Sequence, residues 1–162
     1  MMKPEELKRR VEELRASGGF DLSTEEDLAI GVMHLVNLEE HLYFTGKKTE
    51  KDEYFDLLDR VRAMRKELLE KMISRHEGET WCTCKHLLGA TMRMFEVGTK
   101  LHGDGKKDEA KTYYDKAYEL FSMFWALRLK LVTMPEVKEM AAHEKPMTLN
   151  DIVTNLVNCC DE

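Results

Sequence analysis

The sequence predicts an all-α protein, and three observations carry that prediction. Apolar residues recur at intervals of three and four along most of the chain, which is the period of an amphipathic helix. No segment sustains the alternation of apolar and polar residues that a half-buried strand shows. Proline is absent between Pro4 and Pro135, so nothing interrupts the long periodic stretches. These stretches are therefore expected to be long, unbroken helices.

The first two predicted helices have local start and stop signals. The first is expected over about residues 4–16, with Pro4 near its start, where a missing N–H costs little. Ser17-Gly18-Gly19 follows and ends it. The second is expected over about residues 23–45, where Ser23 with Glu26 three residues later makes a capping-box pattern. Gly46 is the expected end of this helix.

Three further helices are separated by short glycine-containing turns. They are expected over about residues 50–76, 79–101 and 107–132. Gly78 separates the first two of these, and residues 102–105 (HGDG) separate the last two. Residues 133–162 are expected to form a short helical tail, with a helix after Pro135, that packs on the bundle or on a partner.

Four of these helices are long and joined by short connections, which forces sequential helices to run antiparallel. The sequence therefore predicts an antiparallel up-down four-helix bundle core with an extra N-terminal helix and a short helical C-terminal tail. Residues 1–132 would form the helical bundle domain. On the predicted third helix, about 100° per residue places one apolar arc toward the core. This arc comprises Tyr54, Leu57, Val61, Met64, Leu68 and Met72.

Composition and charge exclude several classes of protein. The 162 residues carry a net charge of −6, and Lys and Arg are interleaved with Glu and Asp, so no basic stripe for nucleic acid is predicted. No apolar run approaches the roughly 18 residues of a membrane helix. The N-terminus lacks the apolar segment of a secretory signal, so a cytoplasmic protein is expected.

Glu39 is the most informative polar residue because it falls near the centre of an apolar arc, between Leu35 and Leu42. A carboxylate there needs a partner, since an unpaired buried charge is very costly. Arg65 and Arg128 are the candidate partners, each on the flank of a predicted core arc. Two interpretations stay open: a structural ion pair, or a ligand-binding acid within the bundle.

The segment WCTCKHLL contains a second candidate site, because Cys-x-Cys-x-His suggests metal ligands. On a helix, however, Cys82 and Cys84 lie about 160° apart, so only Cys82 and His86 share a face. Two ligands are half of a structural zinc site. Cys84 is expected in the core as a small apolar side chain. A metal at Cys82 and His86 and a reactive thiol at a helix start remain alternatives.

The predicted fifth helix has a second apolar side formed by Tyr118, Trp125 and Leu129, which requires cover from the tail or from another copy. Because no complete catalytic motif is present, the predicted function is a non-catalytic cytoplasmic interaction or scaffold protein that self-associates and needs no cofactor. The alternative is a helical bundle, with or without enzymatic activity, that binds a metal or a small ligand. It would use either the group Glu39, Arg65 and Arg128 or the pair Cys82 and His86. A thiol redox sensor using Cys82 or Cys159-Cys160 is a third hypothesis.

Overall fold

The computed structural model describes residues 8–10, 12–13, 16 and 22–135, and this part of the chain is helical and contains no strand. Its elements are α2 (Leu22–Thr49), α3 (Glu53–Met72), the short 3-10 helix η1 (Arg75–Glu77), α4 (Glu79–Gly103) and α5 (Lys107–Arg128). The all-α prediction is confirmed. Of the predicted first helix, the described residues are helical. The predicted tail after residue 135, with Cys159 and Cys160, lies outside the described residues.

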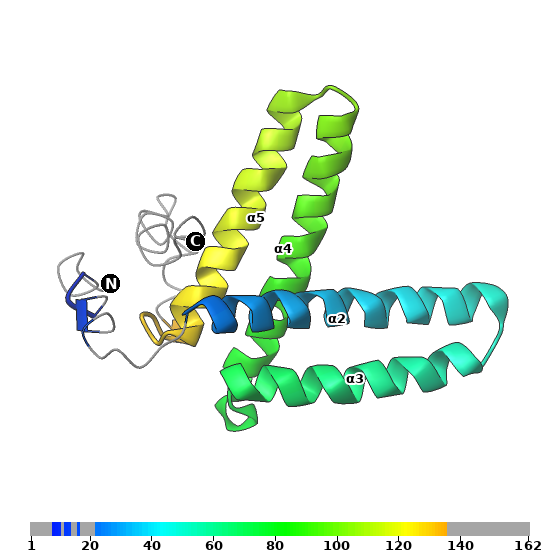
Figure 1. Cartoon of the computed structure of the whole chain (residues 1–162), viewed down its shortest axis with the longest axis horizontal. Helices are drawn as coiled ribbons and strands as arrows, with labels where there is room; N and C mark the ends of the chain where they lie inside the picture. Colours follow the sequence, from blue (N-terminus) through cyan, green and yellow to red (C-terminus); the bar gives the residue numbers. More distant parts are fainter. Residues whose placement is uncertain (1–7, 11, 14–15, 17–21, 136–162) are drawn as a thin grey trace.

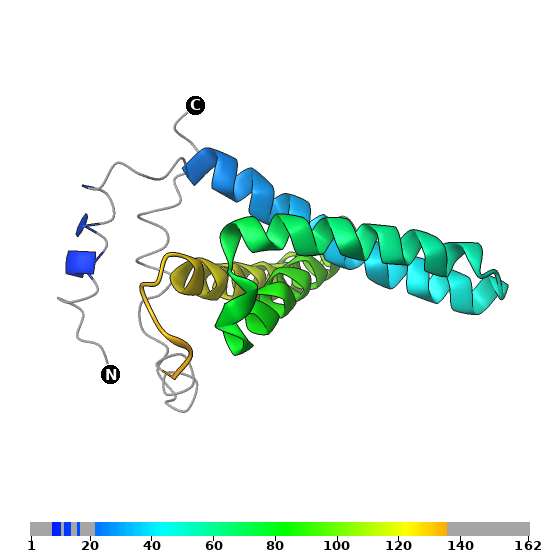
Figure 2. The ribbon, with the colours of Figure 1, turned by 90° about the horizontal axis from the view of Figure 1, so that it is seen from below.

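The four long helices form two antiparallel hairpins, α2–α3 and α4–α5, as the short connections predict. The two hairpins cross each other, and α2 packs on α4 at the crossing (Figures 1 and 2). The connection between α2 and α3 therefore lies far from α4 and α5 in both views. The up-down helix order matches the sequence prediction, whereas the steep crossing of the hairpins was not predicted.

One core at the crossing holds both hairpins together. It draws side chains from all four long helices and from the residues just after α5. Its largest fully buried members are Trp125, Phe124, Leu69, Leu88, Leu131 and Val32. The ring centroids of Phe124 and Trp125 lie 5.4 Å apart in an edge-on arrangement, which aromatic pairs favour. Arg10 Nη1 also donates a hydrogen bond to the Leu131 carbonyl at 3.0 Å.

Two glycines within helices lie at close contacts between neighbouring helices. Gly46 was expected to end the second helix, but α2 continues through it to Thr49. A Cβ at Gly46 would lie 2.9 Å from the Phe55 ring, so the glycine lets α3 begin close against α2. Gly98 is similar on the other hairpin, because a Cβ there would lie 2.8 Å from Tyr114. Tertiary packing thus outweighs the local stop signal.

The inward face of α3 differs from the prediction. Its buried residues are Leu58, Arg65, Leu69 and Met72. Leu57 and Met64, predicted to face the core, are 45% and 54% exposed. The helix has two neighbouring apolar stripes, about 100° apart, and the chain buries the one that contains Arg65. Arg65 can be buried in this stripe because it has a carboxylate partner on α2. The other stripe is left on the surface.

No helix in the described part of the chain is long and apolar enough to cross a membrane.

Candidate functional site

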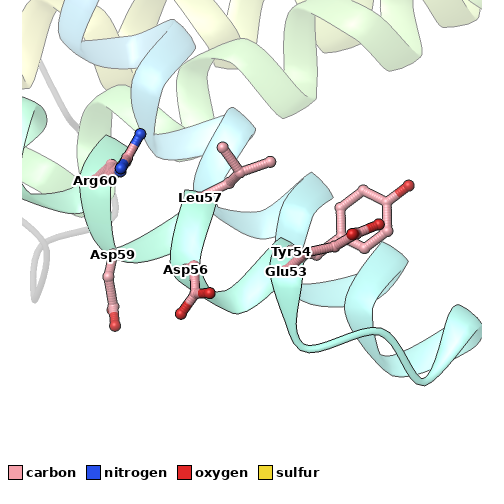
Figure 3. Close-up of a pocket in the computed structure, with 6 residues that line it drawn as sticks. All are labelled: Glu53, Tyr54, Asp56, Leu57, Asp59 and Arg60. Carbon is pink, nitrogen blue, oxygen red and sulfur yellow. The ribbon is translucent and has the colours of Figure 1, made fainter.

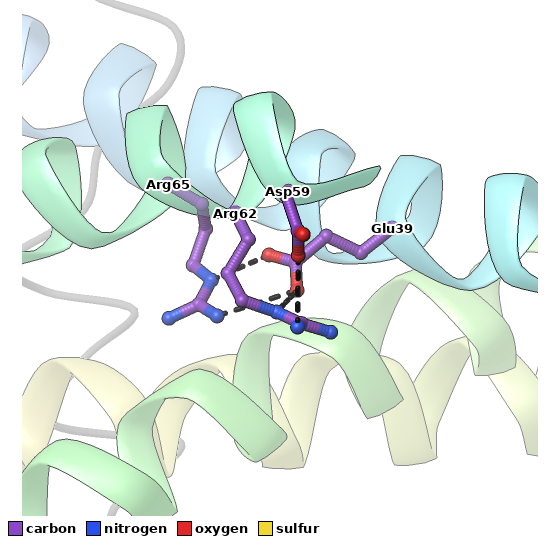
Figure 4. A network of polar contacts seen from close by, with 4 residues as sticks. All are labelled: Glu39, Asp59, Arg62 and Arg65. Atoms are coloured by element: carbon purple, nitrogen blue, oxygen red, sulfur yellow. Dashed lines mark hydrogen bonds and ion pairs between the residues drawn. The ribbon is translucent and has the colours of Figure 1, made fainter. Parts of the chain in front are cut away.

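The carboxylate of Glu39 lies at the centre of a polar cluster between α2 and α3. Glu39 Oε1 accepts a hydrogen bond from Arg65 Nε at 2.7 Å, and Oε2 accepts one from Arg65 Nη2 at 3.3 Å. Arg62 Nε donates to the same Oε2 at 3.2 Å. Arg62 Nη1 also reaches Asp59 Oδ1 at 3.5 Å. Figure 4 shows both arginines converging on the carboxylate from α3.

Helical spacing explains why these groups meet. Asp59, Arg62 and Arg65 follow one another at intervals of three residues, so they lie along one side of α3. Arg65 is only 5% exposed, whereas the Arg62 side chain is 43% exposed. The Arg65 pair is bidentate and largely shielded from water, which makes it the stronger of the two interactions.

Arg128, the other predicted partner of Glu39, lies elsewhere. Its Nη2 and Nε donate to Glu25 Oε2 at 2.9 and 3.2 Å, which joins the start of α2 to the end of α5. The structure thus brings Glu39 and Arg65 together but places Arg128 in a separate ion pair. The second arginine that contacts Glu39 is Arg62. The sequence signal for Arg62 was its position three residues before Arg65.

The cluster has little capacity to bind a ligand. Both carboxylate oxygens of Glu39 are already engaged by arginine, and the buried guanidinium of Arg65 faces that carboxylate. Two described surface depressions have no residue of the Glu39–Arg65 pair in their walls. The geometry is that of a structural ion pair between α2 and α3.

The two depressions differ in their walls. One, of about 510 Å³, lies between α2 and α4 and is lined by Glu40, His41, Phe44, Thr45, Lys48 and Arg93. Arg93 there is held by Glu40, whose Oε2 lies 2.6 Å from Nη2, and by Glu96. The hydrogen bond from Arg93 to Glu40 is the main reason that the pKa of this arginine is raised. The charge of Arg93 is therefore balanced by the carboxylates of Glu40 and Glu96.

The other depression, of about 710 Å³, is lined by residues of α3 alone: Glu53, Tyr54, Asp56, Leu57, Asp59 and Arg60 (Figure 3). Asp56 and Asp59 point away from α2 in this view. A pocket whose walls come from one helix has no opposing wall to enclose a small molecule. It is better described as part of the exposed surface of α3.

The segment WCTCKHLL lies in the first turns of α4, which begins at Glu79. Cys84 is fully buried, and burial is the main cause that raises the pKa of its thiol to about 12. Cys82 and His86 are exposed on one face of the helix. Partial burial, followed by the charges of Lys85 and Arg65, lowers the pKa of His86. Among the residues with described positions, no group of three His, Cys, Asp or Glu side chains could hold a metal ion.

These environments predict unequal thiol reactivity. Iodoacetamide at pH 8 should alkylate Cys82 in the native protein but leave Cys84 unmodified, because Cys84 is buried and only about one in ten thousand of its thiols would be ionised. Peptide mapping by mass spectrometry resolves the two sites, and both should react in denaturant. Equal native rates would contradict the buried position of Cys84.

The interaction surface predicted on the fifth helix is not formed by its three residues together. Trp125 and Leu129 are 0% and 6% exposed and belong to the core, whereas Tyr118 is 39% exposed. The neighbouring rings of Phe121 and Phe124 pack around Trp125. The second apolar side of α5 is therefore largely covered within the chain.

Most of the exposed large apolar residues lie on the α2–α3 hairpin, whereas Phe95 and Tyr118 are exposed on the α4–α5 hairpin. Counted from the Glu39–Arg65 contact, Leu35 and Leu38 lie about 40–100° to one side of α2. Val36 and Glu40 lie to the other side, which faces α4: Glu40 pairs with Arg93, and a Cβ at Gly89 would lie 3.0 Å from Val36 Cγ1. Leu35 and Leu38 thus belong to the face of the hairpin that points away from α4.

On α3 the same sense of rotation from that contact leads to Val61, Leu57 and Met64, at about 40–100°. In an antiparallel pair, equal rotations in the same sense reach the same face. The two helices thus share a surface that we call the outer stripe: Leu35, Leu38, Leu57, Val61, Met64 and Leu68. Leu38, Leu57 and Met64 are 40%, 45% and 54% exposed, and the other three are half-buried.

Comparison of the chain with protein-family models, with curated proteins and with solved structures finds no match in any of the three.

Proposed function

We propose that this protein is a non-catalytic interaction protein that self-associates through the outer stripe of its α2–α3 hairpin. The observation that supports this function is the exposure of Leu38, Leu57 and Met64 on the face of the hairpin that points away from α4. Apolar residues scattered singly over a surface are ordinary, but a contiguous apolar face marks an interaction site.

The α2–α3 hairpin is apolar on two opposite faces. One face packs on α4 at the crossing, and the other carries the outer stripe. A helix pair with two apolar faces needs cover on both. The flexible Met64 side chain at the centre of the exposed face is suited to packing against a partner of irregular shape.

The catalytic and ligand-binding alternatives have less support. The Glu39 carboxylate is occupied by two arginines, and Cys82 with His86 supplies two potential ligands on one face. A small-molecule site requires an enclosed space beside a reactive group, and neither arrangement lines either of the two described depressions. The outer stripe, by contrast, is an exposed apolar face, and such faces mark interaction sites.

Light scattering coupled to size-exclusion chromatography tests this function on the full chain. We expect a species at about twice the 18.9 kDa monomer mass. The double variant Leu57→Glu/Met64→Glu should be monomeric, because it places two charges in the apolar face. Phe95→Glu is a matched control, since Phe95 is 50% exposed on the other hairpin.

Circular dichroism of each variant verifies that the helices remain folded. A wild-type protein that stays monomeric at the highest concentration measured would contradict the proposed function. Dissociation by Phe95→Glu, with Leu57→Glu/Met64→Glu still dimeric, would place the interface on the α4–α5 hairpin instead.

A further inference from the structure

The outer stripe has the spacing of a coiled-coil seam. On α3 its residues, with Tyr54 before them, follow one another at alternating intervals of three and four: Tyr54, Leu57, Val61, Met64 and Leu68. On α2 the same intervals separate Gly31, Leu35, Leu38, Leu42 and Thr45. A sustained repeat of this kind keeps one seam facing a partner helix, where side chains interdigitate as knobs into holes. The α3 series therefore forms a seam on one face, and Leu35 and Leu38 of α2 lie beside it, whereas Leu42 is buried within the chain.

The two edges of the α3 seam differ in chemistry. One edge consists of Leu58, Arg65 and Met72, which are buried within the chain. The other edge carries Glu53, Arg60 and Glu67, which are exposed. In coiled coils, charged residues at the edge positions determine which partner and which orientation are favoured. Only the exposed edge is available for that role here.

Arg60 and Glu67 are opposite charges one heptad apart on the exposed edge, so they lie about 10 Å apart along the helix. That separation is too large for them to pair with each other, and neither forms an ion pair with a residue whose position is described. The edge therefore presents a positive group and a negative group to any partner that lies along it.

On the basis of the proposed function, we propose that the partner of the outer stripe is a second copy of this chain. The two α3 helices pack antiparallel about a two-fold axis near residues 62–63. This arrangement opposes Leu57 to Leu68 of the second copy and Val61 to Met64 of the second copy. It also places Arg60 beside Glu67 of the second copy, and the symmetry repeats the pair. The outer faces of two hairpins then form a four-helix arrangement between the chains.

The parallel arrangement is disfavoured by the same edges. Parallel coiled coils pair one edge of the seam with the opposite edge of the partner. Here that second edge is buried against α2 and contains Arg65, which is bound to Glu39. The antiparallel arrangement pairs the exposed edge with itself, where Arg60 and Glu67 are complementary.

A charge-swap cycle tests this register in the full chain by sedimentation equilibrium. Arg60→Glu and Glu67→Arg should each raise the dimer Kd about tenfold, because each turns two attractive pairs into two repulsive ones. The double variant Arg60→Glu/Glu67→Arg should return the Kd to within about threefold of wild type. Lys100→Glu, an exposed charge reversal on α4, is the control and should change nothing.

The outcomes separate this inference from the proposed function. If Leu57→Glu/Met64→Glu dissociates the dimer but neither single charge swap changes its Kd, the antiparallel register is wrong and the proposed function stands. Single swaps that weaken the dimer without restoration in the double variant would also overturn the register. A wild-type protein that never dimerises would overturn the proposed function and this inference with it.

Discussion

Replacement of Glu39 by alanine is expected to lower the free energy of unfolding by about 3 kcal/mol, near the lower end of the range for breaking a buried ion pair. Arg65 is 5% exposed, and Glu39 is its one partner among the described ion pairs. Without that carboxylate, the buried guanidinium is left beside Arg62, which carries the same charge. The cost arises from the unpaired charge more than from the lost contact.

This explanation predicts how other substitutions behave. Glu39→Leu should be as destabilising as Glu39→Ala to within about 1 kcal/mol, because it too leaves Arg65 unpaired. The double variant Glu39→Leu/Arg65→Leu should recover most of the loss, since the buried charge is then absent. Urea unfolding followed by circular dichroism measures all three variants.

The control is Glu40→Ala, one residue away, where the partner Arg93 is half-exposed and also bound to Glu96. That variant should lose no more than about 1 kcal/mol. If Glu39→Ala were as mild as Glu40→Ala, the Glu39–Arg65 pair would not be shielded from water as the structure places it.

The sequence predicted the positions of the helices along the chain better than the way the two hairpins pack against each other. Helical period and glycine turns were sufficient for four long helices in up-down order, because these signals are local. The crossing of the two hairpins depends on the shapes of side chains distant in sequence. At the crossing, a Cβ at Gly89 would lie 3.0 Å from Val36 Cγ1, so this glycine allows α4 to lie close to α2. Nothing in the local pattern of α4 indicates which helix Gly89 meets.

The polar cluster was partly predictable for the same reason. The position of Glu39 on an apolar arc required a cationic partner, and Arg65 was on the correct side of its helix. The helical position of Arg128 made it an equally good candidate partner for Glu39. The crossing of the hairpins, however, places the end of α5 beside the start of α2, where Arg128 pairs with Glu25. The outer stripe was missed because α3 has two adjacent apolar stripes, and helical periodicity alone ranks them equally.

The largest loss of stability is expected at the crossing. Phe124→Ala should lower the free energy of unfolding by about 3–5 kcal/mol, because Phe124 is fully buried and its removal leaves a cavity. Its ring stacks on Phe121, with centroids 6.2 Å apart, and contacts Trp125 edge-on. A loss of this size is a large fraction of the roughly 5–15 kcal/mol that holds a typical domain together.

The matched control is Phe44→Ala, which removes the same atoms from a residue that is 50% exposed on α2. It should change the free energy of unfolding by no more than about 1 kcal/mol. Because the core joins both hairpins, Phe124→Ala should keep one unfolding transition, with the same midpoint by tryptophan fluorescence and by circular dichroism. Two separate midpoints would mean that the hairpins unfold independently, and that the crossing is too weak a contact to hold the outer stripe of the α2–α3 hairpin in a fixed position.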